Sequence, residues 1–322
     1  MNSTEFRRRT LLIGLASSVV APVFAQSEKN IRCILPNATG SGVDAITRTA
    51  QTALAKALGH PVVVDNQPGA GGIVGLQALA RASADGFTLS VVSNNVVIFP
   101  SVYKSLAFDM PGDFTPIAVI GYTPVVLVVN AKVPAKNAKE LIALLKNKNG
   151  EMNFASGGNG TILHLASEMF LDEAGVKARH IPYKGVGPML TDLIGAQVDF
   201  ATAALPSVQA HLKSGALRAI GAATAQRVAA APEIPTFVEQ GLPNYVVEAW
   251  FAIIGPKGLA PSEVQRVHAA VVAAFDDPLV KEAMAKQGNV INILPAEQAM
   301  PFFRSERLKY AGLVKKAGIE LQ

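Results

Sequence analysis

The stretch IRCILPNATGSGVDAITR, residues 31–48, decides the fold more than any other part of the chain. Its apolar start, IRCIL, is typical of a buried strand, and the pattern after Asp44 is typical of a helix. The loop between them holds two glycines and two hydroxyl side chains. Glycine lets a backbone approach a ligand closely, and a helix start presents free N–H groups with a partial positive charge. The stretch therefore predicts a strand, a loop and a helix arranged to hold an anion.

The segments beyond this stretch repeat the same alternation. β-Branched runs such as PVVVDN (61–66) and FTLSVVS (87–93) alternate with Ala/Leu-rich helical patterns. This order predicts an α/β fold with largely parallel sheets, in two domain-sized series. Extended segments at 124–130 and 246–254 are the candidate crossovers between the series. If the last third of the chain rejoins the first, one domain is discontinuous and a cleft lies between the two.

Residues 1–25 have the pattern of a cleaved signal peptide. Three arginines (Arg7 to Arg9) precede an apolar run over 11–20, and Val23-Phe24-Ala25 supplies a small-residue cleavage site. The arginines fit a twin-arginine signal, and an ordinary Sec signal fits about equally well. No later apolar run has membrane-spanning length. We therefore expect a periplasmic protein whose mature chain does not insert into the membrane.

The charge balance excludes some classes of partner. The formal charge of +5 falls to +3 when the predicted signal peptide, with its three arginines and one glutamate, is removed. The remaining lysines and arginines form no runs, so we expect no nucleic-acid partner. Cys33 is the only cysteine, which excludes an intramolecular disulfide. Within IRCIL it is predicted to be a small core residue.

Four loops that follow predicted strands are rich in Gly, Ser, Thr or Asn, and ligands of open α/β sheets bind at such strand ends. They are NATGSG (37–42), NQPGAGG (66–72), SNN (93–95) and SGGNGT (156–161). Two such loops at helix starts, one from each series, would clamp a small carboxylate, with Thr161 near a helix N-cap. Asp44 would either face that ligand or cap loop N–H groups. His164 and Glu168 lie four residues apart, but no further ligands accompany them, so we expect no metal site.

The catalytic templates match weakly. The segment from Gly69 reads GAGGIV, which lacks the third glycine of a dinucleotide fingerprint. Ser156 lies in FASGG, without the first glycine of a nucleophile elbow, and its general base would be His164, His180 or His211. We therefore expect neither an enzyme nor a cofactor. An exported hydrolase using Ser156, or a cofactor-dependent protein using the loop 69–72, stays open as an alternative.

The chain resembles the Bug family, the TctC-like periplasmic solute receptors of tripartite tricarboxylate transporters. The resemblance runs from the signal peptide to the C-terminus and rests on seven motifs in the right order. They are PNATGSGVDAITR (36–48), VVDNQPGAGG (63–72), DFTPIAVI (113–120), NFASGGNGTILHL (153–165), PYKGVGPMLTDLIGAQVD (182–199), GALRAIG (215–221) and AWFAIIGPKGLAP (249–261).

This resemblance implies a type II periplasmic-binding-protein fold, with two α/β domains, two crossover segments and a ligand cleft between the domains. It predicts one domain over 26–125 and 249–322 and the other over 126–248. It also implies a receptor that captures a small organic anion, a carboxylate or an acidic amino acid, and delivers it to the membrane subunits of a tripartite transporter. A sensory receptor that docks on a signalling partner would have the same fold and cleft.

The resemblance also implies the residues of the site. On one side of the cleft they are Thr39, Gly40, Ser41 and Gly42, and on the other Ser156, Gly157, Gly158, Asn159, Gly160 and Thr161. By the same analogy His164 and Lys184 lie nearby, and the walls are Asn94, Ala203 and Ala204. Ser41 departs from the family, which usually has a second glycine there, so we expect its hydroxyl to bond the ligand.

Overall fold

The computed structural model describes residues 29–322, and the predicted signal peptide lies outside them. The strands are β1 (Ile31–Leu35), β2 (Val62–Asn66), β3 (Thr88–Ser93), β4 (Phe114–Thr123), β5 (Val125–Asn130), β6 (Asn153–Ser156), β7 (Arg179–Pro182), β8 (Phe200–Ala204), β9 (Leu217–Ala222), β10 (Ala249–Pro256) and β11 (Val290–Ile291). The helices are α1 (Gly42–Leu58), α2 (Ile73–Ala80), α3 (Asn95–Ile98), α4 (Ala138–Lys148), α5 (Ile162–Ala174), α6 (Val186–Ile194), α7 (Leu205–Lys213), α8 (Pro261–Asp276), α9 (Pro278–Lys286) and α10 (Ala296–Lys316), with short 3-10 turns η1 (Ala70–Gly72) and η2 (Phe99–Ser101).

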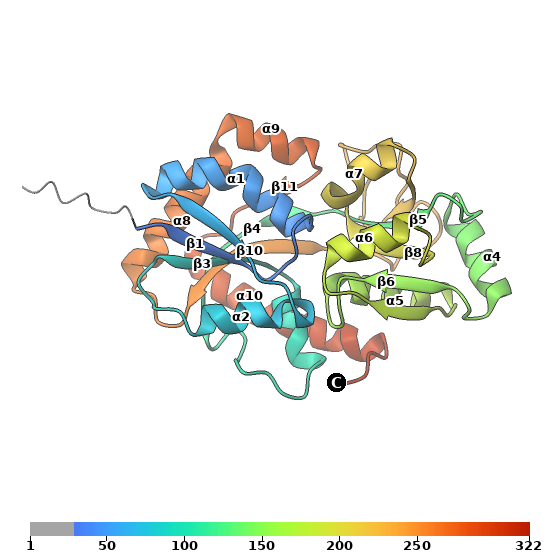
Figure 1. The fold of residues 1–322 in the computed structure, drawn as a ribbon, viewed down its shortest axis with the longest axis horizontal. Coiled ribbons are helices and arrows are strands. Elements are labelled where there is room, and N and C mark those ends of the chain that lie inside the picture. Colours follow the sequence, from blue (N-terminus) through green and yellow to red (C-terminus); the bar gives the residue numbers. More distant parts are fainter. Residues whose placement is uncertain (1–28) are drawn as a thin grey trace, which may run out of the picture.

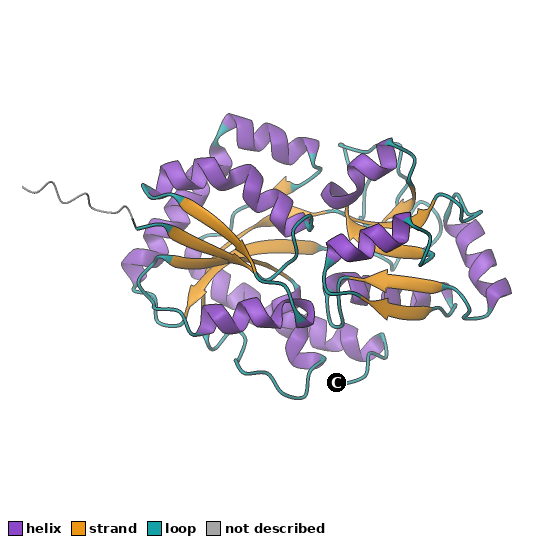
Figure 2. Ribbon diagram, in the orientation of Figure 1, coloured by secondary structure: helices purple, strands orange, loops and turns teal. Residues whose placement is uncertain are grey.

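These elements form two lobes that lie side by side, each built on one sheet (Figure 1). Lobe 1 contains the six-stranded sheet, in the order β11-β4-β10-β3-β1-β2, and lobe 2 contains the five-stranded sheet, in the order β7-β6-β8-β5-β9. Helices cover both faces of the lobe 1 sheet (Figure 2). The chain changes sheets at Pro124, between β4 and β5, and again between β9 and β10. The exact domain limits given above stay a prediction.

The expectation of largely parallel sheets is wrong in part, because both sheets are mixed. β1 runs parallel to β2 and β3, but β10 runs antiparallel to β3 and β4. In lobe 2, β6 runs parallel to β7 and β8, while β5 is antiparallel to β8 and β9. The antiparallel strands β5 and β10 are the first that the chain forms after each change of sheet. Each therefore enters its new sheet from the other lobe, against the direction of the local βαβ strands.

Helix α1 shows how local sequence sets the element that borders the cleft. Ser41 is its N-cap, and Gly59 ends it in the left-handed conformation, at φ +71°. Ile46, Ala50 and Leu54 recur every four residues, so they share one face and are buried against lobe 1. The helix starts at Gly42, three residues earlier than the pattern from Ala45 predicts, because Ser41 caps it.

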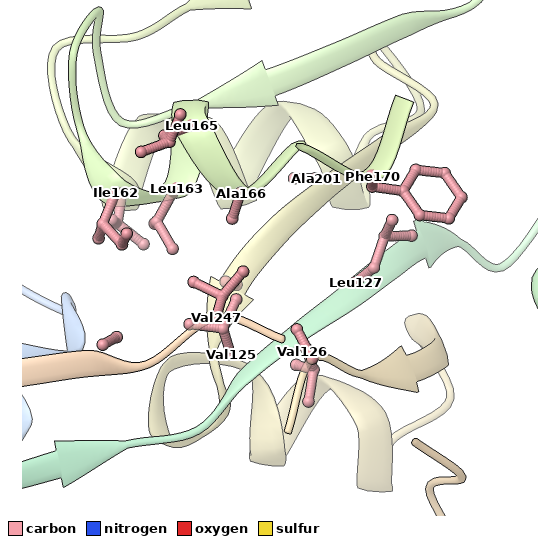
Figure 3. Close-up of a cluster of buried hydrophobic side chains, with 14 of the residues drawn as sticks. Val125, Val126, Leu127, Ile162, Leu163, Leu165, Ala166, Phe170, Ala201 and Val247 are labelled. Carbon is pink, nitrogen blue, oxygen red and sulfur yellow. The ribbon is translucent and has the colours of Figure 1, made fainter. Parts of the chain in front are cut away.

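Helix α5 is the matching element of lobe 2. Thr161 is its N-cap, as the sequence predicts, and Gly175 ends it at φ +61°. Its apolar side chains, including Leu165 and Phe170, pack over β5 and β8 in a core that Figure 3 shows in close-up. Burying a side chain of this size stabilises the fold by about 1.5–3 kcal/mol. Both helix starts are therefore fixed by a cap in front and a buried core behind.

None of the helices within 29–322 combines the length and the apolar character that a bilayer crossing requires. Cys33 is buried in β1, as predicted, and burial raises the pKa of its thiol to about 12.

Candidate functional site

The loop between β1 and α1 forms lobe 1's side of the candidate site. Gly40 has φ +81°, a conformation that glycine adopts without strain, and the N–H of Ser41 donates to the carbonyl of Ala38 at 3.1 Å. The hydroxyl of Ser41 then accepts a hydrogen bond from the N–H of Asp44 at 3.2 Å. Among residues 29–322, no acceptor is found for the Ser41 hydroxyl proton. That proton is therefore free for a ligand.

Asp44 supports this loop from behind. Its Oδ2 accepts from the N–H of Gly40 at 3.0 Å, and its Oδ1 accepts from Arg48 Nε at 2.9 Å and Asn66 Nδ2 at 3.0 Å. The carboxylate is buried and its negative charge is compensated by Arg48. Asp44 is not among the residues that line the cavity described below. Of the two roles that the sequence allows, the geometry matches the capping of loop N–H groups.

The loop over 157–161 forms the opposite side. The hydroxyl of Thr161 accepts from the N–H of His164 at 3.2 Å and donates to the carbonyl of Gly158 at 2.8 Å. Gly158 and Gly160 have φ of +137° and +68°, so the loop turns twice through conformations that other residues rarely adopt. The hydroxyl proton of Thr161 is thus already used inside the loop, unlike that of Ser41.

Two imidazoles lie under this loop, that of His164 buried and that of His180 half-buried. His164 Nδ1 accepts from the N–H of Gly160 at 3.3 Å, and His180 Nε2 lies 2.7 Å from Ser156 Oγ. The two rings stack with centroids 3.8 Å apart and planes 9° apart. Burial, with a smaller contribution from His164, lowers the pKa of His180 to about 3, so this ring is neutral at neutral pH.

The starts of α1 and α5 leave backbone donors free. The first four N–H groups of a helix have no partner within it. In α1 the N–H of Asp44 is capped, while no partner is found for those of Gly42 and Val43 in the described chain. In α5 the N–H of Ile162 donates to Asn95 Oδ1 of lobe 1 at 2.8 Å, so Leu163 keeps the free N–H. These free groups carry the partial positive charge that favours an anion.

A cavity between the lobes connects the two helix starts. Its free volume is about 60 Å³, taken as the space open to the centre of a water-sized sphere. One water occupies roughly 10–15 Å³, so the cavity has room for a small organic molecule. Its walls are mainly small and apolar, including Ala38, Val125 and Ala249. Lys184, exposed at the edge, is the one charged side chain among the lining residues of the described chain.

The structure brings six of the predicted site residues to the cavity wall. They are Ser41, Gly42, Gly157, Thr161, Lys184 and Ala204. Others lie close by but outside the lining: Thr39 and Gly40 are exposed, Gly158, Asn159 and Gly160 complete the loop of lobe 2, and Asp44, Ser156, His164 and Ala203 are buried behind the wall.

Asn94 also lies outside the lining, and its neighbour Asn95 takes the place expected for it. The Asn94 side chain is fully buried, where it accepts from the N–H of Trp250 at 2.9 Å and donates to the carbonyl of Glu248 at 3.0 Å. Asn95 begins α3 and lines the cavity. The SNN pattern marked this loop, but pattern alone does not tell which asparagine faces inward.

Sequence reasoning missed several other lining residues. Ser93, Thr123 and Trp250 come from the ends of β3, β4 and the start of β10. Gly69 and Gly71 belong to a loop that the sequence marked as glycine-rich without assigning it to the site. The SNN pattern marked the loop that contains Ser93, whereas a position near one end of a strand was the only available signal for Thr123 and Trp250.

The two lobes touch around the cavity. The Tyr103 hydroxyl donates to the carbonyl of Asn159 at 3.1 Å, and Asn159 Nδ2 donates to Gln322 Oε1 at 3.0 Å. A Cβ placed on Gly42 would lie 2.7 Å from the Cβ of Ala204, closer than such atoms approach. The cleft is therefore closed, and its closure depends on glycine at position 42.

Comparisons with known proteins agree with this geometry. Residues 46–319 match the family model described as "Tripartite tricarboxylate transporter family receptor". The chain belongs to this receptor family. Protein BugT of Bordetella pertussis is 34% identical over the full length of both chains.

Solved structures show the same fold for this receptor. The periplasmic binding protein BugD superposes with a TM-score of 0.87 at 30% identity, over 92% of this chain and 99% of that one. Rpa4515 of R. palustris, solved with adipate, superposes with a TM-score of 0.88 at 26% identity, over 92% and 100%. The predicted periplasmic-binding-protein fold and the family resemblance are thus confirmed.

Proposed function

We propose that this receptor is a non-catalytic periplasmic protein that captures a small organic carboxylate and delivers it to the membrane subunits of a tripartite transporter. The observation that carries the proposal is the convergence of two capped helix starts, α1 and α5, on one closed cavity. Membership of the receptor family, and the adipate in the related Rpa4515 structure, support it.

The carboxylate would lie against the free N–H groups of Gly42, Val43 and Leu163 and the hydroxyl of Ser41. Hydrogen bonds from N–H groups to an ionised carboxylate are about twice as strong as neutral ones. Closure of the lobes removes water, which strengthens these bonds further. Because the donors are held in place before the ligand arrives, little ordering cost opposes binding.

The rest of the ligand would be compact and largely apolar. Ala38, Val125 and Ala249 face it, and no aspartate or glutamate of the described chain lines the cavity. An α-ammonium group would therefore lack a carboxylate partner, at a considerable desolvation cost. This favours an organic acid over an acidic amino acid.

One observation bears on the hydrolase alternative, namely the 2.7 Å contact between Ser156 and His180. Ser156 is fully buried outside the cavity lining, and its hydroxyl also contacts the N–H and carbonyl of Gly158. A ring with a pKa of about 3 is a weak base at neutral pH. The cofactor alternative assigns the loop 69–72 to a cofactor. In the structure this loop packs against lobe 2 instead, because a Cβ on Gly71 would lie 3.1 Å from the carbonyl oxygen of Asn159. Both features favour binding over chemistry.

A thermal-shift screen tests the proposal. The protein is stripped of bound molecules by unfolding and refolding, then heated with monocarboxylates, di- and tricarboxylates, aromatic acids and acidic amino acids. A ligand at about 100 times its Kd adds roughly 2.7 kcal/mol, enough to raise the Tm by several degrees. We expect a compact organic acid to shift the Tm and to be recovered unchanged afterwards. A folded protein with no shift from any acid, or recovery of a converted product, would contradict the proposal.

A further inference from the structure

The stacked imidazoles of His164 and His180 contact the ligand loop, 157–161, from the side away from the cavity. His164 Nδ1 holds the N–H of Gly160, and His180 reaches Gly158 through the hydroxyl of Ser156. Neither imidazole lines the cavity. Both act on the loop backbone just before the N-cap of α5. The pair therefore supports the loop from behind, outside the cavity wall.

We propose that His164, against which His180 stacks, is a positioning residue that holds the ligand loop in its binding geometry only while its own ring is neutral, so that ligand capture weakens in acid. This inference rests on the proposed function for the identity of the captured ligand. Its structural part concerns the loop alone.

The hydrogen bond to Gly160 fixes the required protonation state. Because Nδ1 of His164 accepts from an N–H group, it carries no proton, and the proton of the neutral ring lies on Nε2. Nε2 faces Glu168 Oε1 at 3.5 Å, which suits a donor. A second proton on Nδ1 would remove the acceptor of Gly160 and leave that buried N–H unpaired.

The surroundings of the pair offer little to balance a positive charge on either ring. Glu168, on α5, is the one charged side chain that the described chain places against either ring. From β6, Phe154 stacks on His180 with ring centroids 4.8 Å apart and lies 6.1 Å from His164, and Phe200 of β8 packs against Phe154. Arg179, the neighbour of His180 in β7, is exposed and points to the opposite face of the strand. A proton on either ring would place a cation against the face of the other imidazole.

Glycine amide resonances test the inference in the wild-type protein without any ligand. With 15N-labelled glycine and histidine, the amides of Gly158 and Gly160 and the imidazole nitrogens are followed from about pH 8 to about pH 4.5. We expect the Gly160 amide to shift with the same midpoint as the His164 imidazole, and its exchange protection to fall roughly tenfold or more below that midpoint. Gly175, at the other end of α5, should not respond. A Gly160 amide that stays unchanged while the His164 imidazole titrates, or a His164 imidazole that stays neutral over this whole range, would overturn the inference.

The variant His164→Gln separates the proton from the packing. A glutamine carbonyl accepts the N–H of Gly160 but does not titrate, so the acid response of Gly160 should disappear. His268→Gln is the matched control, since it removes another half-buried imidazole, which contacts the carbonyl of Leu294 at 2.9 Å in lobe 1. That variant should keep the wild-type response. An unchanged response in His164→Gln would overturn the inference.

Titration with adipate at about pH 7.5 and about pH 5 measures capture itself. We expect binding to weaken when the pH is lowered from about 7.5 to about 5. In the wild type and in His268→Gln the loss should be roughly tenfold larger than in His164→Gln, a difference of about 1.4 kcal/mol. Protonation of adipate is the same for all three proteins, so it cancels in the comparison. Equal weakening would overturn the link to capture. Failure of adipate to bind at either pH would count against the proposed ligand class, while the Gly160 amide still decides the loop mechanism.

Discussion

The starts of α1 and α5 are built alike but leave different groups free. In each, a hydroxyl accepts the N–H three residues on at 3.2 Å, from Ser41 to Asp44 in α1 and from Thr161 to His164 in α5. The hydroxyl proton of Ser41 has no acceptor among residues 29–322, whereas that of Thr161 goes to the carbonyl of Gly158. Within the described part of the chain, two backbone N–H groups of α1 and one of α5 have no partner, because Asn95 accepts from the N–H of Ile162.

The two lobes therefore contribute different groups to the candidate site. Lobe 1 offers two N–H groups and a hydroxyl to an anion, and its loop is held from behind by Asp44. Lobe 2 uses most of its donors to fix its own loop and to reach Asn95 across the cleft. We infer that lobe 1 holds the carboxylate first and that lobe 2 then closes over it.

Gly42→Ala should have the largest effect. The new Cβ would lie 2.7 Å from that of Ala204, so the lobes would be kept apart while alanine suits a helix start. We expect the affinity for the acid found in the screen to fall roughly 100-fold or more, about 2.7 kcal/mol, with little change in the Tm of the free protein. Calorimetry measures the affinity, and small-angle scattering measures closure.

The double variant Gly42→Ala/Ala204→Gly is the control for this clash. It removes the opposing Cβ and should recover most of the lost affinity. Wild-type affinity in the Gly42→Ala single variant would show that the ligand binds without the closure seen here.

Ser41→Ala and Thr161→Ala compare the two caps directly. Each loses a cap, at a cost of about 1 kcal/mol in unfolding free energy. Ser41→Ala also loses a donor to a charged ligand, so its affinity should fall roughly tenfold or more, while that of Thr161→Ala should fall only a few-fold. Urea unfolding and calorimetry measure the two effects.

Ser41→Thr keeps both the cap and the hydroxyl donor and serves as the matched control, with an affinity near that of the wild type. Equal losses in the two alanine variants would remove the asymmetry between the lobes.

Stability should fall in mild acid because of His180. Burial lowers the pKa of this ring to about 3, against about 6.5 in an unfolded chain. Between these values the unfolded chain binds a proton that the folded chain does not, so the unfolding free energy decreases as the pH falls from about 6.5. We expect a loss of roughly 1–2 kcal/mol between about pH 7 and about pH 5 in urea titrations.

His180→Gln should flatten this dependence, and His268→Gln should not. Two exposed carboxyls have a lowered pKa, Asp85 through its hydrogen bond from Lys29 and Glu239 through hydrogen bonds from the N–H of Thr236 and from Arg227, and they lose their contribution only in stronger acid. A wild-type slope retained in His180→Gln would assign the acid sensitivity to other groups.

Tyr103→Phe should have the smallest effect. It removes the 3.1 Å hydrogen bond to the carbonyl of Asn159, at the edge of the closed cleft. A neutral, half-buried bond of this kind contributes about 0.5–1.5 kcal/mol, so we expect a loss of affinity of a few-fold by calorimetry. A loss of affinity as large as that of Gly42→Ala would show that closure of the lobes depends mainly on contacts at the edge of the cleft.

Much of the fold could be predicted because its determinants are local. The Thr161 cap, the core position of Cys33 and most strand and helix patterns depend on residues within a few positions of each other. The antiparallel entries of β5 and β10 could not be predicted from local pattern, since they depend on how the chain returns from the other lobe. The two-residue strand β11 is too short to leave a periodic signal.

The site was predicted less completely than the fold. Ser41, Gly42 and Thr161 were found because glycines and caps mark strand-to-helix turns. Asn95 and Trp250 reach the cavity through contacts between segments far apart in the chain, which no short pattern encodes. The stacking of His164 on His180 likewise joins α5 to β7.

Calorimetric titration with the selected acid and with its primary amide tests whether the two helix starts bind a carboxylate between the lobes. The two molecules have nearly the same shape, but only the acid carries the charge that the helix starts of α1 and α5 favour. We predict that the amide binds roughly 100-fold more weakly or not measurably, a difference of about 2.7 kcal/mol. Equal binding of acid and amide would contradict a carboxylate clamp between the two lobes.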